Sequence, residues 1–253
     1  MIREKISLMG CPVDNLTMVE SLEIIDQAIN RKEQIHHTVV NAGKMVMMQT
    51  DKALFDSVVS ADMINADGQA IVWAAKVLGI PLKERVTGID LMENLVKKAH
   101  EDNRKIFFFG AKEAVVKEVV ERYSNTYSPK IIAGYRNGYF DETETAAIAK
   151  QISDSGAHIL FVAISSPTKE IFLNSYKNEL AKLNFIMGVG GSFDVVAGKV
   201  KRAPVWMQKS GLEWFYRFLQ EPGRMWKRYL VGNTKFVMLV LKSYLSKPKN
   251  KKQ

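Results

Sequence analysis

Short apolar runs alternate with longer segments of helical period along most of the chain. The runs are rich in β-branched and aromatic residues, which is typical of strands buried on both faces. They cover residues 37–40, 63–65, 106–109, 131–133, 159–164 and 185–189. The segments of helical period cover residues 18–30, 69–78, 91–101, 112–123, 144–155 and 169–180. This alternation predicts an α/β fold with a doubly wound, mostly parallel, Rossmann-like sheet, whose ligands bind at the carboxyl ends of the strands.

The C-terminal part of the chain has a different pattern. Residues 205–219 and 224–245 are expected to form two helices, separated at Glu221-Pro-Gly. We therefore expect an α/β domain over residues 1–204 and a helical appendage over residues 205–253. Residues 199–253 contain 14 Lys or Arg and two acids, a formal charge of +12, whereas the whole chain carries +9.

Aromatic residues lie between these cations and include Trp206, Trp214 and Trp226. Aromatic rings settle at the headgroup level of a membrane, and Lys and Arg attract its acidic lipids. The appendage is therefore expected to dock on an anionic membrane surface. Two alternatives remain: a solvated helix pair that packs on the domain or on another subunit of a homo-oligomer, and a nucleic-acid-binding segment, because nucleic-acid phosphates would use the same cations.

Composition limits the class of protein. With 253 residues, of which 47% are hydrophobic, the chain can form one large domain and an appendage. Its first residues lack the apolar core of a secretory signal, and no run approaches the roughly 18 consecutive apolar residues of a membrane span. A single cysteine, Cys11, rules out an internal disulfide and a cysteine zinc cluster. We therefore expect a cytoplasmic protein that associates peripherally with the inner face of the cell membrane.

Chemically active residues follow several of the predicted strands. Asp67 comes after the second strand, where it could cap the next helix, start a turn with Gly68, or accept a proton as a general base. Arg85, with Thr87 and Gly88, could hold a phosphate, although an exposed arginine beside a helix cap is an equal alternative. The spacing of the residues does not decide between these alternatives.

Three further loops carry weaker signals. Gly110 could bring the backbone close to a nucleotide or could merely end a strand. Lys169 could meet a diphosphate or be a solvated charge at a helix start. The segment Gly188-Val-Gly-Gly-Ser-Phe-Asp194 could approach a ribose or base, although tight turn packing explains its glycines equally well.

Other chemistries lack their motifs. The four histidines have no metal-ligand spacing, and no pair of aspartates is separated by one residue, so no bound metal and no cofactor are expected. The glycine-rich dinucleotide fingerprint, the Gly-x-Ser-x-Gly elbow and the phosphate loop are also missing. A second class of enzyme, a nucleotide-dependent methyltransferase, uses the same kind of sheet and is an alternative. It would be recognised by binding of S-adenosylmethionine.

A succession of motifs resembles the WecG/TagA/CpsF family of bacterial glycosyltransferases over nearly the whole chain. These motifs are Asn65-Ala-Asp-Gly68, Arg85-Val-Thr-Gly-x-Asp90, Gly188-Val-Gly-Gly-Ser-Phe-Asp194, Lys201-Arg-Ala-Pro204 and Gly211-Leu-Glu-Trp-Phe-Tyr-Arg217. The resemblance implies an inverting, metal-independent transferase that moves a sugar from a UDP donor to a lipid-linked acceptor. The motif sequences of this chain are most similar to those of TagA-like members. In those members, N-acetylmannosamine is transferred to N-acetylglucosaminyl-diphospho-undecaprenol in the synthesis of wall teichoic acid. Relatives that build capsule or exopolysaccharide use other donors, such as N-acetylmannosaminuronate, glucose or galactose.

The same resemblance assigns expected roles to single residues. Asp67 becomes the expected base and Arg85 a ligand of the diphosphate. The remaining expected substrate contacts are Asn41, Asn65, Thr87, Gly110, Lys169, Gly188, Gly190, Asp194, Arg217, Arg224 and Arg228. Lys169 stands where TagA-like members have glutamine, so the identity of the donor sugar stays open.

Overall fold

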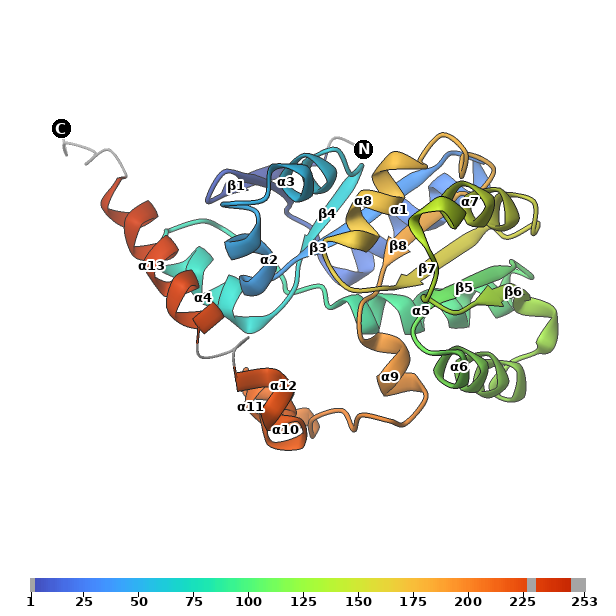
Figure 1. Cartoon of the computed structure of the whole chain (residues 1–253). Coiled ribbons are helices and arrows are strands. Elements are labelled where there is room, and N and C mark those ends of the chain that lie inside the picture. Colours follow the sequence, from blue (N-terminus) through green and yellow to red (C-terminus); the bar gives the residue numbers. More distant parts are fainter. Residues whose placement is uncertain (1–2, 227–230, 247–253) are drawn as a thin grey trace.

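The computed structural model describes residues 3–226 and 231–246. A six-stranded parallel sheet lies at its centre, with strands in the order β4-β3-β8-β7-β5-β6 (Figure 1). The strands are β3 (Ile35–Val40), β4 (Met63–Ala66), β5 (Ile106–Gly110), β6 (Ile132–Arg136), β7 (Ile159–Ala163) and β8 (Phe185–Gly188). All six predicted strands are thus present, and the predicted doubly wound α/β fold is confirmed.

Alternate residues of the strands pack into opposite layers, because side chains of a strand point to its two faces in turn. Phe108 and Phe161 pack in one core cluster with the helices α1, α5 and α6, whereas Phe107 and Leu160 pack in another with α7 and α8. These helices are α1 (Met18–Asn30), α5 (Gly88–Glu101), α6 (Glu113–Thr126), α7 (Thr145–Ser153) and α8 (Thr168–Ser175). Both faces of the sheet are therefore covered, which explains why the strands are apolar throughout.

The predicted helix at 18–30 has the predicted bounds because its start is specified locally. The side chain of Thr17 accepts a hydrogen bond from the backbone N–H of Glu20, whose side chain accepts one from the N–H of Thr17. This reciprocal arrangement satisfies two of the donors that a helix start leaves unpaired.

Several elements were not predicted. An antiparallel hairpin, β1 (Lys5–Leu8) and β2 (Cys11–Asp14), precedes α1, and two helices, α2 (Ala42–Met47) and α3 (Lys52–Val59), join β3 to β4. The helix α9 (Ser192–Val196) and the short 3₁₀ turns η1 (Pro129–Ile131) and η2 (Glu142–Glu144) were not predicted either, whereas the predicted helix over residues 69–78 is present as α4 (Gln69–Val77).

The prediction of one helix over residues 205–219 is wrong. The chain forms α10 (Val205–Lys209) and α11 (Glu213–Gln220), because Gly211 between them has a φ of +77°, a left-handed conformation that ends a helix. α12 (Pro222–Trp226) follows at the predicted Pro222 break, and α13 (Gly232–Leu245) follows the undescribed residues 227–230. α13 lies beside α2 and α4 (Figure 1), and its Phe236 and Val240 are buried in the core cluster on that side.

Candidate active site

Asn41 and Asp67 lie side by side at the carboxyl edge of the sheet. They follow the neighbouring strands β3 and β4, in which Val40 is paired with Ala66. The backbone N–H of Asp67 donates to the carbonyl of Val40 at 2.8 Å. The Asn41 side chain accepts a hydrogen bond of 3.0 Å from the N–H of Lys44 and so begins α2. The two loops therefore form one wall of a site above β3 and β4.

The Arg85 segment forms the opposite side of this site. The N–H of Val86 donates to the carbonyl of Ala66 at 2.9 Å, which holds this segment against the end of β4. Thr87 is buried and caps α5, and the backbone N–H of Gly88 lies close enough to the Asp67 carboxyl to lower its pKa. Asp67 therefore lies near the start of α5, where unpaired N–H groups favour negative charge. The alternative in which Asp67 caps the next helix is wrong, because α4 has Gly68 at that position and no side-chain cap.

The C-terminal helices complete the site. Arg217 on α11 was an expected substrate contact, and its guanidinium lies 4.0 Å from the carboxylate of Glu213. The same carboxylate lies 3.8 Å from the guanidinium of Arg85. Glu213 was not proposed from the sequence, although it is one of only two acids among residues 199–253. The rarity of acids in this basic segment was the sequence signal that could have identified Glu213 as a candidate.

A second ion pair connects the start of the appendage to α5. The Arg202 guanidinium lies 2.6 Å from the carboxylate of Asp90, which also accepts a hydrogen bond from the Thr87 hydroxyl. The hydroxyl of Thr87 is thus hydrogen-bonded within the protein, and Thr87 lies at the start of α5 because it caps that helix.

Asp67 binds its proton more tightly than an ordinary aspartate. Burial raises the pKa of its carboxyl from 3.8 to about 6, and the negative charge of Glu213 adds to the rise. Arg85, the N–H of Gly88 and Arg217 oppose this rise without cancelling it. A half-buried carboxylate with a pKa near neutrality can accept a proton and release it again, as a general base must.

Asparagine at position 67 is expected to stabilise the fold at neutral pH. The folded-state pKa of about 6 lies above the ordinary value of 3.8, so the folded protein binds more protons between these pH values. The charged carboxylate therefore costs stability above pH 6, on the order of 1 to 3 kcal/mol. Urea unfolding of Asp67→Asn and the parent at pH 8 and at about pH 4 should show a gain that shrinks as the pH falls. A gain that grew on acidification would contradict the assignment.

Lys169 lies in a buried charge network. Its ammonium contacts the Ser166 hydroxyl and lies 2.8 Å from the Glu170 carboxylate, and Lys44 approaches the same carboxylate oxygen at 2.8 Å. Lys44 also donates to the carbonyl of Val39 at 2.6 Å. The three charged side chains are at most 8% exposed, so the alternative of a solvated charge at Lys169 is wrong. The role of Lys169 toward a diphosphate stays a prediction.

Glycines allow close packing around this network. A Cβ at Gly188 would lie 2.9 Å from the side chain of Lys169, so the lysine stem covers the end of β8. A Cβ at Gly110 would lie 2.5 Å from the backbone of Ala163, and the φ of Gly110 is +125°. Gly110 is thus required where β5 meets β7, and it is the last residue of β5, as the alternative of a strand end expects. Its role toward a nucleotide stays a prediction. Gly190 has a φ of +54° and opens the turn before α9.

The remaining expected residues are distributed as follows. Asn65 is fully buried, and its amide pairs with the ring of His37 at 2.8 Å and with the Ser21 hydroxyl at 3.3 Å, inside the protein. Asp194 is half-buried in the first turn of α9. Arg228 and the side chain of Arg224 lie outside the described residues.

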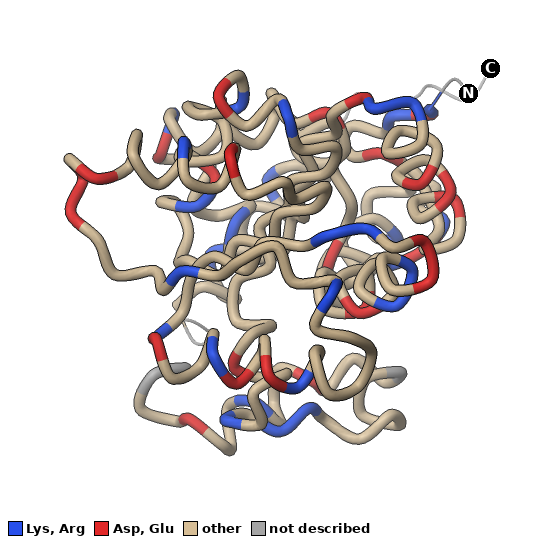
Figure 2. The backbone as a smooth tube through the Cα atoms, turned by 90° about the vertical axis from the view of Figure 1, so that its right-hand side faces the viewer, with Lys and Arg blue, Asp and Glu red and all other residues tan. Residues whose placement is uncertain are grey.

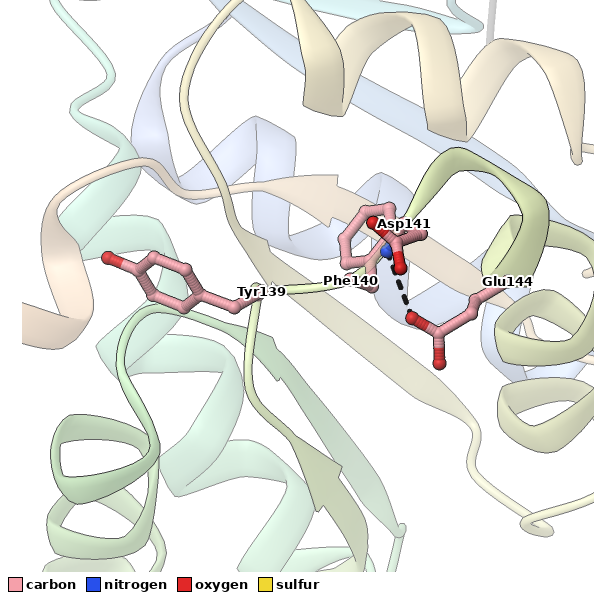
Figure 3. A pocket seen from close by; sticks show the side chains of 5 residues that line it. Tyr139, Phe140, Asp141 and Glu144 are labelled. Carbon is pink, nitrogen blue, oxygen red and sulfur yellow. Dashed lines mark hydrogen bonds between the residues drawn. The ribbon is translucent and has the colours of Figure 1, made fainter.

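A separate shallow pocket lies after β6, at the opposite end of the sheet from Asp67. It is lined by Gly138, Tyr139, Phe140, Asp141 and Glu144 (Figure 3). The backbone N–H of Asp141 donates to the Glu144 carboxylate at 2.9 Å across its wall, as the dashed line in Figure 3 marks. Of the expected site residues that the structure describes, none lines this pocket.

A carboxylate beside two arginines and a helix start, at the carboxyl edge of a doubly wound sheet, is typical of group-transfer enzymes that bind phosphorylated substrates. Residues 6–250 match the model of the glycosyl transferase WecG/TagA/CpsF family, and the chain belongs to that family.

Several curated relatives carry the name N-acetylglucosaminyldiphosphoundecaprenol N-acetyl-beta-D-mannosaminyltransferase. The relative from Bacillus subtilis (strain 168) is 39% identical over 202 residues, which cover 80% of this chain and 75% of the relative. The relative from Staphylococcus aureus (strain MW2) is 31% identical over 239 residues, which cover 94% of this chain and 91% of the relative. The similarity therefore includes both the sheet and most of the C-terminal helices.

Proposed function

We propose that this protein transfers N-acetylmannosamine from a UDP donor to N-acetylglucosaminyl-diphospho-undecaprenol, with inversion and without a metal ion. The observation that carries the proposal is the Asp67 carboxylate, which lies near Arg85 and the start of α5 and has a pKa of about 6. The names of the relatives from Bacillus subtilis and Staphylococcus aureus support the choice of sugar and acceptor.

The mechanism follows from the placement of these groups. Asp67 accepts the proton of the acceptor hydroxyl as its oxygen attacks the anomeric carbon from the face opposite UDP. The bond to the diphosphate breaks in the same step, and the negative charge that develops there is stabilised by Arg85, Arg217 and the N–H groups at the start of α5. Arg224 and Arg228 are proposed to join them. Asn41 and Asp194 line the donor site, with Asp194 toward the nucleoside.

A different donor sugar is the second candidate. Lys169 stands where TagA-like members have glutamine, and its ammonium and that of Lys44 each lie 2.8 Å from the Glu170 carboxylate, beneath the ends of β3, β8 and β7. A cation in place of a neutral amide favours a sugar with an anionic or strongly polar substituent, as in an N-acetylmannosaminuronate donor. The protein would then serve capsule or exopolysaccharide synthesis.

A transfer assay with mass spectrometry tests both candidates. The purified protein is incubated with a lipid-diphosphate-GlcNAc acceptor and, one at a time, UDP-ManNAc, UDP-ManNAcA, UDP-GlcNAc, UDP-glucose and UDP-galactose. Product from UDP-ManNAc alone supports the first proposal, and product from another donor alone supports the second. If no donor gives product although calorimetry shows that UDP binds, the proposed acceptor is wrong. If UDP does not bind, the proposed function is wrong.

We further propose that residues 1–204 are the catalytic domain and that residues 205–253 dock it on an anionic membrane at the cytoplasmic face. No helix among residues 3–226 and 231–246 is long and apolar enough to cross a bilayer. Figure 2 shows basic positions along the lower edge of the molecule, which the C-terminal helices form. Large apolar side chains are exposed on the same helices and on the nearby α4, and we call them the docking surface. They are Trp73, Trp206, Trp214, Phe215, Leu219 and Trp226.

Alanine at both Trp206 and Leu219 is expected to weaken vesicle binding. Each side chain is at least 60% exposed, so their removal leaves the core intact. Loss of the two from the headgroup layer should lower partitioning into vesicles with anionic lipid by roughly 10- to 100-fold. Co-sedimentation measures this, and Val19→Ala on α1, which is 63% exposed, is the matched control. Equal binding of the double variant and the parent would exclude this docking surface. Deletion of α13 is a poorer test, because Phe236 and Val240 belong to the core.

A further inference from the structure

Glu213 is an acid that the basic appendage brings into the site of Asp67 and Arg85. Its carboxylate lies 3.8 Å from the Arg85 guanidinium and 4.0 Å from that of Arg217. The side chains of Glu213 and Arg85 are 23% and 19% exposed, so this contact is shielded from bulk solvent on most sides. An ion pair in such surroundings is screened less by salt than a surface pair.

The packing of α11 places Glu213 there. A Cβ at Gly211 would lie 2.4 Å from the Cγ of Gln69, so the chain before α11 is pressed directly against the first residue of α4. Gln69 lies two positions after Asp67. The start of α11 is thus fixed against the loop that carries Asp67, and Glu213 is the first residue of that helix.

We propose that Glu213 is a positioning residue of the transfer site, which holds Arg85 between α5 and α11 and sets a second negative charge beside Asp67. The inference rests on the proposed function of Asp67 as the general base. It adds an acid to the part that the arginines of the appendage have in the proposed chemistry.

Two consequences follow from this arrangement. The groups that face Asp67 among the described residues are Arg85, the N–H of Gly88, and Glu213 and Arg217 on α11. Glu213 is the one of these that raises the pKa of Asp67, after burial itself, and so makes it a stronger base. Glu213 also competes for Arg85 with an incoming diphosphate, since both are anions. Neutralising Glu213 should therefore make Asp67 a weaker base and UDP a tighter ligand.

The test is Glu213→Gln in the full-length protein. The acid limb of the profile of kcat/KM against pH should move to lower pH by about half a unit or more, because the repulsion that favours protonated Asp67 is gone. The maximal rate should fall, since a weaker base accelerates less. UDP should bind several-fold more tightly by calorimetry. Glu213→Asp should restore part of each effect, which a merely structural side chain would not do.

Glu221→Gln is the matched control, because it removes the same charge from the other acid of the appendage. It should leave the pH profile of kcat/KM and the affinity for UDP unchanged. If Glu213→Gln is too slow to assay, a carbon NMR titration of the Asp67 carboxyl in both proteins gives the same comparison. An unchanged acid limb and an unchanged UDP affinity would overturn the inference. If Asp67→Asn keeps full turnover, the proposed role of Asp67 as the general base fails instead, whatever the result at position 213.

Discussion

Asparagine in place of Asp67 is expected to lower the turnover of sugar transfer by roughly 10²- to 10⁴-fold, with little loss of UDP affinity. The amide cannot accept the proton of the acceptor hydroxyl, whereas the groups proposed for the diphosphate, Arg85 and the start of α5, stay in place. The parent enzyme should also lose activity as the pH falls below about 6, the pKa of Asp67, because the base becomes protonated. Initial rates over a pH series, with calorimetry of UDP binding, measure both effects.

Asp141→Asn is the matched control for this experiment. Asp141 also follows a strand of the sheet at its carboxyl edge, but it lies in the separate pocket beyond β6 (Figure 3). Its replacement should leave turnover within about twofold, since it takes no part in proton transfer. Full turnover of Asp67→Asn under the same conditions would remove Asp67 from the mechanism.

Glutamine in place of Glu170 is expected to destabilise the protein by about 3 to 5 kcal/mol. The change leaves the ammonium groups of Lys44 and Lys169 buried without the carboxylate that lies 2.8 Å from each. Burial alone would raise the pKa of Glu170, but the two lysines outweigh it and hold that pKa at about 2. The stabilisation is therefore present above the ordinary value of 4.5 and is lost as the pH falls toward 2.

Thermal and urea unfolding at pH 7 measure the loss, which for a chain of this length corresponds to about 6 to 20 °C in Tm. Asp56→Asn is the control, because its pair with Lys52 is exposed and should matter little. The triple change of Lys44, Glu170 and Lys169 to methionine should recover most of the stability, since apolar replacement of a buried ion network is often neutral or better. A single Glu170→Gln variant as stable as the parent would contradict this account.

Most of the sheet could be predicted because its strands are buried on both faces and carry their signal locally. The hairpin β1–β2 was missed because its segments are four residues each and their burial depends on packing against β4. α2 and α3 were missed for a related reason: they are six and eight residues long, and each begins with a polar cap, Asn41 or Asp51. Short elements contain too few turns for periodicity to show.

The candidate site was predictable where function depends on position after a strand. Asp67 and Asn41 meet because the neighbouring parallel strands β3 and β4 bring their loops to one edge, and Arg85 reaches the same edge because the N–H of Val86 donates to the carbonyl of Ala66 at the end of β4. Glu213 could not be placed in the same way, because no spacing rule connects residue 213 to residue 85 across the sheet. The burial of Lys169 could not be predicted either, because it depends on Lys44, which is remote in sequence and lies on α2.

The burial of α13 has a consequence for the order in which the newly made chain folds. The core cluster around β1, β2, β4 and α4 is drawn from residues 6–82 and is completed by Phe236 and Val240. A ribosome delivers those two residues last, so the N-terminal part of this core keeps an exposed apolar surface throughout synthesis. Chaperone binding to nascent chains should accordingly persist until the C-terminus is released, and premature termination after residue 226 should leave a chain that aggregates.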